Sequence, residues 1–410
     1  MPASSPPIKR FLLASVLKPV DDTRMRGKFA QTLLEWPQTE VHVAGRDTGD
    51  DLHYTLAEDF PRVMHHAIFW GSRLSLNRLA AQRRYWHLLR ILKPDLVIVH
   101  APELLPLTLL WRALGRGRQF AYDIRENYAL NVGTQQVYRG WLKRGLATGL
   151  RWVEGLAVRR AAAVFLAEAS YADELPFLAP LPPGRVLVLE NKYQPGTDEE
   201  LPHMARPLPT TGEPVRLLFS GTISELNGVY EAVALAEALH QAWPGGARLT
   251  IIGFCQQPAL LGSLTGLIER LNNAFPGLVT LIGGAEHVPH ARIVAEMQQA
   301  HLGLLPYRPH PSTWRCRPTK LFEYLAHRLP VLVPDNPLWT SIVQTYNAGL
   351  IVDFGQPSLA ATTVATALLS AHFYPTGVPT DPVLWAGEGK KLRHLLETLG
   401  LGPTFAAPFA

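Results

Sequence analysis

Two neighbouring runs decide the fold of this chain: Arg317-Pro318-Thr319-Lys320-Leu321-Phe322-Glu323-Tyr324-Leu325-Ala326 and, close behind it, Pro330-Val331-Leu332-Val333-Pro334. The first predicts a helix that begins at Pro318, whose missing N–H would be unpaired there anyway, and the second predicts a buried strand. The free N–H groups and the dipole of the first helical turn favour a bound phosphate, and Lys320 adds a positive charge. Glu323 follows within reach of a ribose diol beside that phosphate. An ordinary solvated helix face, with Glu favoured by the dipole alone, stays open as the alternative.

Apolar runs alternate with segments of helical period through almost the whole chain. In the first half we predict strands over residues 11–16, 40–44, 67–70, 95–100, 119–123, 163–166 and 186–190, with helices over 24–35, 74–92, 104–114 and 139–160. In the second half we predict strands over residues 215–220, 249–253, 279–283, 302–307, 331–334 and 350–353, with helices over 229–242, 290–300, 318–328, 337–346, 358–371 and 382–399. The alternation predicts an α/β protein of two doubly wound, Rossmann-like domains facing a cleft, with a ligand at the carboxyl ends of the strands.

A polar, proline-rich stretch without periodicity separates the two halves. It predicts a linker over residues 196–214, between a first domain over 1–195 and a second over 215–375. At 410 residues the chain is long enough for two such cores. The last segment, 376–410, predicts a helix and a loose tail that pack back on the first domain.

Basic charge gathers in the first half of the chain. The formal net charge is +5, but residues 73–93 alone carry six basic and no acidic side chains. Residues 139–160 carry six basic side chains and one acidic, mixed with Trp141, Trp152 and several leucines. This mixture is typical of helices at an anionic membrane surface, and equally of amphipathic helices packed on a sheet. Nucleic-acid binding is disfavoured, because no recognised module accompanies the cations.

The apolar run over residues 11–17 is too short to cross a membrane, and the Lys18-Pro19 that follows it makes a poor cleavage site for a signal peptide. Cys255 and Cys316 have neither C-x-x-C spacing nor a histidine cluster beside them. We therefore expect no metal, no disulfide framework and a cytoplasmic location.

Several polar residues directly follow predicted strands, where doubly wound folds keep their sites. In the second half these are Gly221, Thr222, Tyr307, Arg315, Arg317, Pro318 and Thr319. Arginines beside a helix N-terminus are unfavourable unless an anion is present, although a solvated loop is a fair alternative. In the first half they are Asp22, Arg24, His100, Asp123 and Glu126. Carboxylates there can act as acid–base groups or hydroxyl acceptors, or simply as helix caps.

Taken together, this pattern resembles the GT-B glycosyltransferases, and most closely glycosyltransferase family 4. The resemblance is carried by Phe219-Ser220-Gly221-Thr222, Asn227-Gly228-Val229, Pro318-Thr319-Lys320-Leu321-Phe322-Glu323-Tyr324-Leu325-Ala326 and Ala348-Gly349-Leu350. The first half matches more loosely, through Asp21-Asp22-Thr23-Arg24 and Tyr122-Asp123-Ile124-Arg125-Glu126.

The resemblance implies transfer of a sugar from a nucleoside-diphosphate sugar to a glycan or lipid-linked acceptor, with retention and without a required metal or other cofactor. It implies that Glu323 holds the donor ribose, while Gly221 and the helix from Pro318 hold the diphosphate. Tyr307, Thr222, Thr319, Arg315, Arg317 and Lys320 would complete the donor site. Asp123, Glu126 and Lys320 are the catalytic candidates, and Asp22, Arg24 and His100 would face the acceptor. A peripheral position at the inner face of the membrane follows from the basic segments.

Two positions depart from the family pattern. The family often pairs its glutamate with another eight residues earlier, where this chain has Arg315. The usual basic pair of the glycine loop is replaced by Thr222 and Asn227. We hypothesise that Arg315, Arg317 or Lys320 supplies the missing charge. A nucleotide-sugar epimerase on the same fold and a non-catalytic sugar-nucleotide-binding subunit of a polysaccharide-assembly system stay open as alternatives.

Overall fold

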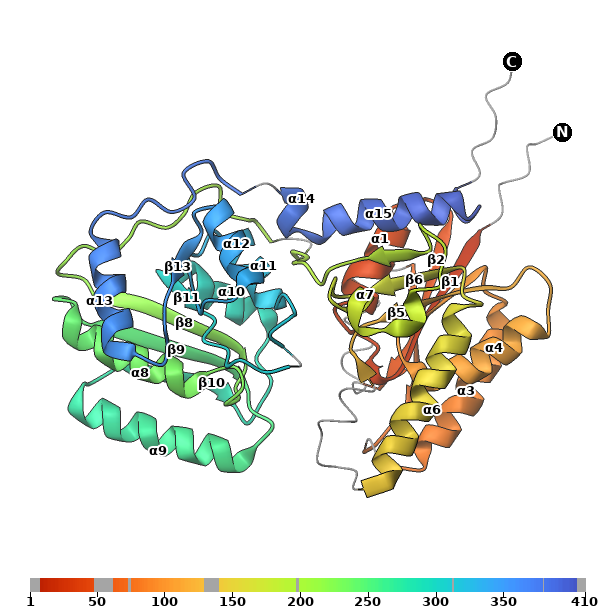
Figure 1. Ribbon diagram of the computed structural model, residues 1–410, viewed down its shortest axis with the longest axis horizontal. Coiled ribbons are helices and arrows are strands. Elements are labelled where there is room, and N and C mark those ends of the chain that lie inside the picture. The colour runs from red at the N-terminus through yellow and green to blue at the C-terminus, as the bar shows by residue number, and fades with distance from the viewer. Residues whose placement is uncertain are drawn as a thin grey trace, which may run out of the picture. The chain divides into compact units, whose positions relative to one another are not determined.

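The computed structural model describes residues 8–47, 62–72, 75–128, 140–196, 199–311, 313–378 and 380–403. The chain divides into two compact units (Figure 1). The first runs to Gln194 and includes the segment that begins at Trp385, and the second is Pro195–Leu384.

The first unit contains a parallel sheet in the order β3-β2-β1-β4-β5-β6-β7. The strands are β1 (Lys9–Pro19), β2 (Thr39–Arg46), β3 (Val63–Phe69), β4 (Leu96–Val99), β5 (Gln119–Ile124), β6 (Ala163–Leu166) and β7 (Val186–Val188). The central strands β1 and β4 are apolar on both faces and completely buried in their middles, as expected where helices cover both sides of a parallel sheet.

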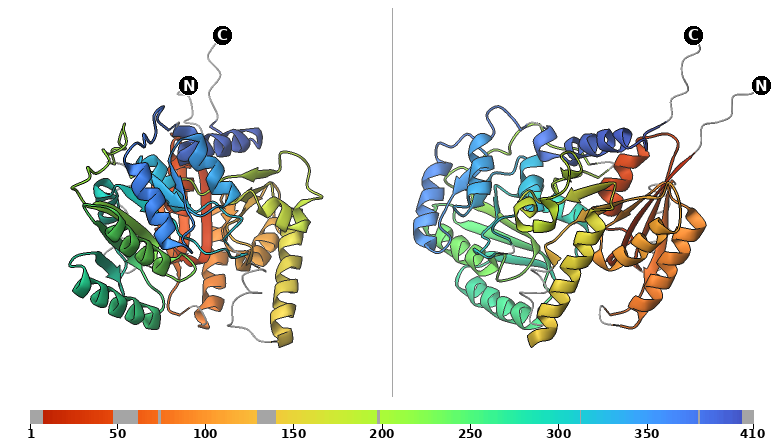
Figure 2. Two further views of the ribbon diagram at one scale, coloured as in Figure 1. Left: turned by 60° about the vertical axis from the view of Figure 1, so that its left-hand side comes forward. Right: turned by 45° about the vertical axis from the view of Figure 1, so that its right-hand side comes forward.

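Helices cover the two faces of this sheet. One face packs against η1 (Met25–Ala30), α1 (Gln31–Leu34) and the C-terminal α15 (Trp385–Thr398), through a core that includes Phe11, Phe29 and Trp385. On the other side, α3 (Asn77–Leu92), α4 (Leu105–Ala113) and α6 (Gly140–Val158) lie side by side (Figure 2). Short helices η2 (Pro102–Leu104), α7 (Tyr171–Glu174) and η3 (Pro176–Leu178) occupy the connections.

The second unit contains a parallel sheet in the order β10-β9-β8-β11-β12-β13. The strands are β8 (Val215–Thr222), β9 (Ala247–Phe254), β10 (Val279–Gly284), β11 (Leu302–Leu304), β12 (Val331–Val333) and β13 (Gly349–Ile351). The helices are α8 (Val229–Ala242), α9 (Pro258–Ala274), α10 (His290–Gln299), α11 (Thr319–Ala326), α12 (Pro337–Thr345), α13 (Pro357–Leu368) and α14 (Thr380–Val383).

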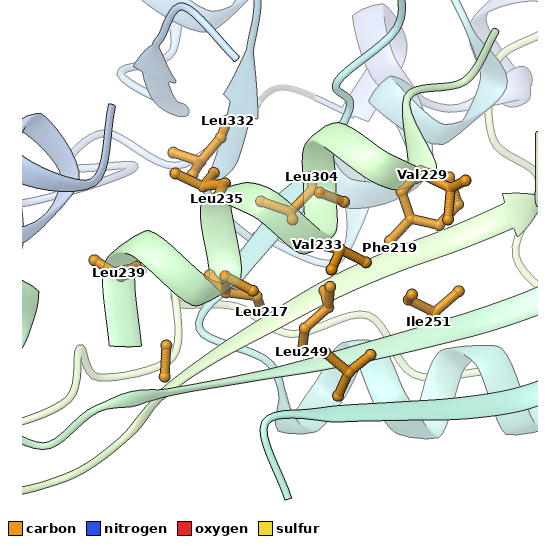
Figure 3. Packing of buried hydrophobic residues seen from close by; sticks show 14 of the residues in the cluster. Leu217, Phe219, Val229, Val233, Leu235, Leu239, Leu249, Ile251, Leu304 and Leu332 are labelled. Atoms are coloured by element: carbon orange, nitrogen blue, oxygen red, sulfur yellow. The ribbon is translucent and has the colours of Figure 1, made fainter. Parts of the chain in front are cut away.

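The core of this second unit includes the sheet and the buried faces of α8, α9 and α13. Leu217 and Phe219 of β8 and Leu249 and Ile251 of β9 point toward Val233 on α8 (Figure 3). Because neighbouring residues of a strand point to opposite faces, β8 also presents Arg216, Leu218 and Ser220 to its other side.

The predicted fold class, α/β with two doubly wound Rossmann-like domains, is confirmed. Three local predictions need correction. The strand predicted over 302–307 ends at Leu304, because Pro306 has no N–H for the ladder. Pro318 is the N-cap of α11 rather than its first residue. Helix α9 was not predicted, although Leu260, Leu264, Ile268 and Leu271 form its buried stripe.

The basic segments are only partly within the described chain. Arg73 and Arg139 lie outside the described residues, as do the side chains of residues 140–144 and 146. Among the helices that the structure does describe, none has the length and apolar character needed to cross a membrane.

Candidate functional site

The site in the second unit begins at the carboxyl end of strand β8, where Gly221 is the second-last residue. Its φ of +110° lies in the region that disfavours side chains. A Cβ atom there would meet the Lys320 Cε at 3.2 Å, so the absent side chain leaves room for Lys320 to lie against the strand end. The start of α11 and the end of β8 are thereby brought together.

Glu323 is the central group of this site. It is 2% exposed, its Oε2 lies 2.6 Å from the Lys320 Nζ, and its Oε1 lies 2.8 Å from the His290 Nε2. Burial alone would raise the pKa of the Glu323 carboxyl, but the Lys320 charge and the hydrogen bonds from His290 and Lys320 outweigh it and lower the pKa to about 2. The carboxylate is therefore ionised at neutral pH and keeps lone pairs for further donors.

One buried tyrosine ties α11 to β8, and another packs against α12. The Tyr324 hydroxyl lies 2.9 Å from the Ser220 Oγ and accepts a hydrogen bond from the Ser220 N–H at 3.2 Å. Tyr307 packs edge-on against Trp339 with ring centroids 5.7 Å apart. Burial first, and then the nearby Glu323 carboxylate, raise the pKa of Tyr307 to about 12, so its hydroxyl stays protonated.

The glycine loop after β8 is closed by its own polar groups. The Asn227 side chain donates to the Thr222 carbonyl at 2.8 Å. Gly228, with φ of +77°, is the N-cap of α8, and a Cβ atom there would come within 1.9 Å of the Pro306 carbonyl oxygen. Only glycine fits this contact, so the loop lies close under the segment that leads to Tyr307. Asn227 is thus a loop-closing residue, and exposed Thr222 contributes its backbone carbonyl.

The segment before α11 is held by α12. The Trp314 carbonyl accepts from the Asn336 side chain at 2.7 Å, and the Cys316 carbonyl accepts from the Trp339 indole at 2.8 Å. Arg315 in this segment is exposed, whereas Arg317 is half-buried. Thr319 is the first residue of the helix. The predicted donor residues therefore gather at one end of the second unit, around Gly221, Lys320 and Glu323.

In the first unit, Asp123 forms a buried ionic cluster at the end of β5. Its two carboxylate oxygens accept from the Arg24 guanidinium at 2.7 and 2.8 Å, and Oδ2 also lies 2.8 Å from the His100 Nδ1. Asp123 and His100 are 0% exposed and Arg24 is 1% exposed. Burial would raise the pKa of Asp123, but the Arg24 charge outweighs it and the pKa lies well below its usual range. This geometry disfavours proton transfer by Asp123 and fits a positioning role.

The other predicted first-unit residues form two pairs at the same strand ends. Asp22 Oδ1 accepts from the N–H groups of Arg24 and Met25, so it caps η1, and its carboxylate binds the Arg125 guanidinium at 2.8 and 3.0 Å. Glu126 accepts from the Lys18 Nζ at 3.2 Å, and both side chains are partly exposed. Glu126 therefore remains accessible, unlike Asp123.

Sequence reasoning missed His290 and Lys18 as members of these sites. His290 begins α10, far along the chain from Glu323, and nothing in its neighbours indicates that contact. Lys18 is the second-last residue of β1, directly behind its apolar run, and that position was the available signal.

Comparison with known proteins identifies a family domain in the first half of the chain and the fold of the whole. Residues 34–192 match the model of a glycosyl transferase 4-like domain. No curated protein matches the sequence. The structure resembles sucrose-phosphate synthase from Thermosynechococcus elongatus, at 14% identity and a TM-score of 0.63 over 96% of this chain and 99% of that one. It also resembles HepE of Anabaena in complex with UDP and glucose, at 15% identity and a TM-score of 0.62 over 95% of this chain and all of the other.

A third similar structure comes from a different enzyme class. It is a Listeria monocytogenes protein assigned as a UDP-N-acetylglucosamine 2-epimerase, at 13% identity and a TM-score of 0.58 over 98% of this chain and all of the other. At these identities the likeness establishes the fold. Residues 34–192 are therefore similar to a glycosyl transferase 4-like domain, and the chain has the GT-B fold of two Rossmann-like domains.

Proposed function

We propose that this protein transfers a sugar from a nucleoside-diphosphate sugar to a glycan or lipid-linked acceptor. The observation that carries the proposal is the placement of Lys320 at the start of α11, against Gly221 and beside the buried Glu323 carboxylate. A cation, free helical N–H groups and an ionised carboxylate at one strand end are complementary to a diphosphate joined to a ribose. The family match and the UDP-bound fold neighbour support this assignment.

The mechanism follows from the charge that develops on the leaving group. When the sugar–phosphate bond breaks, negative charge grows on the nucleoside diphosphate, and Lys320 with the first-turn N–H groups of α11 stabilises it. Arg317, half-buried just before the helix, and exposed Arg315 are the further cations within this segment. These fixed charges let us propose a reaction that needs no metal, with retention of configuration as the family resemblance implies.

Glu323 is proposed to accept hydrogen bonds from the donor ribose. Both of its oxygens are already engaged, but a carboxylate offers about four lone-pair positions, so two remain. Because His290 is half-exposed whereas Glu323 is buried, the His290 ring is the group proposed to move when the ribose binds. On the first unit we propose Glu126, with Lys18, as the accessible acid–base candidate, while Asp22, Arg24, His100 and Asp123 position the strand ends on the acceptor side.

A panel of nucleoside diphosphates tests the donor assignment. We expect one of them to raise the unfolding temperature, because a ligand present at 100 times its Kd stabilises the folded state by about 2.7 kcal/mol. The corresponding nucleoside is the control, since it lacks the diphosphate that Lys320 would bind. If no member of the panel shifts unfolding more than its nucleoside does, the donor-site assignment fails.

Product analysis with the preferred donor separates the alternatives. A glycosyltransferase releases free nucleoside diphosphate only as acceptor is glycosylated. An epimerase converts the sugar nucleotide without any acceptor, and the similar Listeria structure makes this an alternative to test. A non-catalytic subunit binds the nucleotide and leaves the donor intact.

We also propose that the first unit binds an anionic membrane surface, where a lipid-linked acceptor would be found. At the start of α3, Leu76 and Leu79 are 85% and 68% exposed. The exposed Arg83 follows Leu79 by about one helical turn, and the exposed Arg90 lies in the last turn of the helix. Exposed leucines can insert among the lipid acyl chains while the arginines contact the anionic headgroups.

Co-sedimentation with vesicles containing anionic lipid tests this surface. We expect the parent protein to bind at low salt and to dissociate as salt rises, because about 1 kcal/mol per basic residue is screened. The double substitution Leu76→Glu and Leu79→Glu should abolish binding. Leu359→Glu, at an exposed position of α13 in the second unit, is the matched control and should bind as the parent does. Binding that is absent, or insensitive to salt, removes the proposal.

A further inference from the structure

We infer that a cavity of about 280 Å³ at the amino ends of β8, β9 and β10 is a second ligand site, which binds a small sugar phosphate. Its walls include Arg216, Arg248, Thr250, Thr280, Glu296 and Gln299. Arg216 precedes Gly221 by five residues on the same strand, so the cavity lies about 16 Å from the donor site, toward the opposite end of the sheet. The inference does not depend on the donor assignment.

Two arginines stand side by side in this cavity. Arg216 of β8 and Arg248 of β9 are register partners, with strands about 4.8 Å apart, and both side chains leave the same face of the sheet. Like charges in directly opposed positions destabilise a sheet. Among the residues that the structure describes, no carboxylate forms an ion pair with either one. A bound dianion would remove this repulsion and accept from both guanidinium groups.

His301 does not accept a hydrogen bond from the Arg216 guanidinium. The Arg216 backbone N–H donates to the His301 Nδ1 at 3.0 Å, while its guanidinium Nη2 lies 3.2 Å from the other ring nitrogen, Nε2. A neutral imidazole that accepts at Nδ1 carries its proton at Nε2, so that nitrogen cannot also accept. Burial first, and then the charges of Arg216 and Arg206, lower the pKa of His301 to about 4, which keeps the ring neutral. The guanidinium of Arg216 therefore keeps donors available for a ligand.

The remaining walls suit hydroxyl groups rather than a second phosphate. Thr250 and Thr280 are register partners on β9 and β10, and with Gln299 of α10 they offer both donors and acceptors. Glu296 adds a carboxylate whose charge is balanced by Arg292 at 2.7 Å, four residues earlier on α10. Helix α10 packs on β8 and β9, so it forms one wall of the cavity.

The size of the cavity limits the ligand. Sites for drug-sized molecules span about 300–1,000 Å³, and this cavity is just below that range. Two guanidinium groups on one side of the cavity and side chains that hydrogen-bond to hydroxyl groups on the other are complementary to a sugar phosphate with a single ring. A nucleoside-diphosphate sugar, with two phosphates and two rings beside its base, exceeds the space.

Isothermal titration of the full chain with glucose 6-phosphate and with inorganic phosphate tests the site. We expect saturable binding of both probes and tighter binding of glucose 6-phosphate, because only it uses the threonine and glutamine wall. Arg216→Gln and Arg248→Gln should each weaken binding by about 10-fold or more, since each removes a charge-assisted hydrogen bond. Without ligand, either variant should be at least as stable as the parent, because like-charge repulsion is relieved.

Arg270→Gln, an exposed arginine of α9 in the same unit, is the matched control and should bind as the parent does. Stabilisation by the preferred nucleoside diphosphate should be unchanged in Arg216→Gln, which separates this site from the donor site. The inference is overturned if neither probe binds saturably at millimolar concentration. It is equally overturned if binding survives both arginine substitutions but is lost in Lys320→Met, because the probe would then occupy the diphosphate seat.

Discussion

Asp123→Asn is expected to lower the free energy of unfolding by about 3–5 kcal/mol. The substitution keeps the shape of the side chain but removes the charge that faces Arg24. Because Arg24 is 1% exposed, its guanidinium would stay buried without a counter-charge. That is the costly case for a buried ion pair, since the desolvation of the cation is no longer offset.

The same change should loosen the C-terminal helix. The Arg24 guanidinium lies 5.2 and 5.5 Å from the centroids of the Phe29 and Trp385 rings, which also pack against each other, and Trp385 begins α15. The Trp385 indole also donates to the Thr32 hydroxyl at 2.9 Å. Displacement of Arg24 therefore disturbs the contact that holds α15 on the first unit, and Trp385 fluorescence should report it before global unfolding.

Urea unfolding of Asp123→Asn beside Glu126→Gln measures the effect. Glu126 lies three residues later but pairs with Lys18 at the surface, so its substitution should change the free energy by no more than about 1 kcal/mol. In the parent, the lowered pKa of Asp123 means that its contribution is present above the ordinary pKa of aspartate and is lost as pH falls toward the folded value. Asp123→Asn should therefore unfold with a weaker dependence on acid. Equal stability of the two variants would show that Asp123 is not the buried counter-ion inferred here.

Lys320→Met is expected to weaken nucleoside-diphosphate binding by about 10- to 100-fold, the loss of one charge-assisted contact with the phosphates. Methionine keeps the apolar stem that lies against Gly221. The substitution also removes one of the two partners described for the Glu323 carboxylate, which is 2% exposed, and leaves His290. We therefore expect a second effect, a loss of stability of about 2–3 kcal/mol, together with a rise of the Glu323 pKa from about 2.

A double substitution separates the two effects. In Lys320→Met with Glu323→Gln the unpaired buried charge is gone, so stability should recover while nucleotide affinity stays low. Urea unfolding and titration with the preferred nucleoside diphosphate are the two measurements. If Lys320→Met binds as tightly as the parent, the missing charge of the glycine loop is not supplied by Lys320, and the half-buried Arg317 becomes the candidate. If the double variant recovers affinity as well, the single variant failed through instability alone.

Much of the donor site in the second unit could be predicted, because its residues are near one another in sequence. Lys320 and Glu323 are three residues apart on one helix, and that spacing alone puts them on neighbouring positions of its surface. Gly221 and Thr222 end an apolar strand, which in a parallel sheet puts them at the edge where ligands bind. The contact between Lys320 and Gly221 links two such local signals across the sheet.

Other features depend on contacts between distant segments. His290 reaches Glu323 over 33 residues, and Arg24 reaches Asp123 over 99. Asp123 and Glu126 have the same local environment in sequence, at the end of the same strand. The structure buries the first and leaves the second accessible, a difference between two candidates that the sequence treats alike. Helix α9 was missed for a different reason, since its apolar stripe was present but interrupted by glycines and polar residues.

By itself the sequence determined the α/β class, the two doubly wound domains and the end of each strand at which polar residues gather, because these follow from the period of apolar residues along the chain. Tertiary structure alone decided which of those residues are ion-paired, buried or open, because charge compensation depends on partners brought from other strands. It also decided that Arg216 and Arg248 stand side by side, since strand order and register are set by packing across the whole sheet.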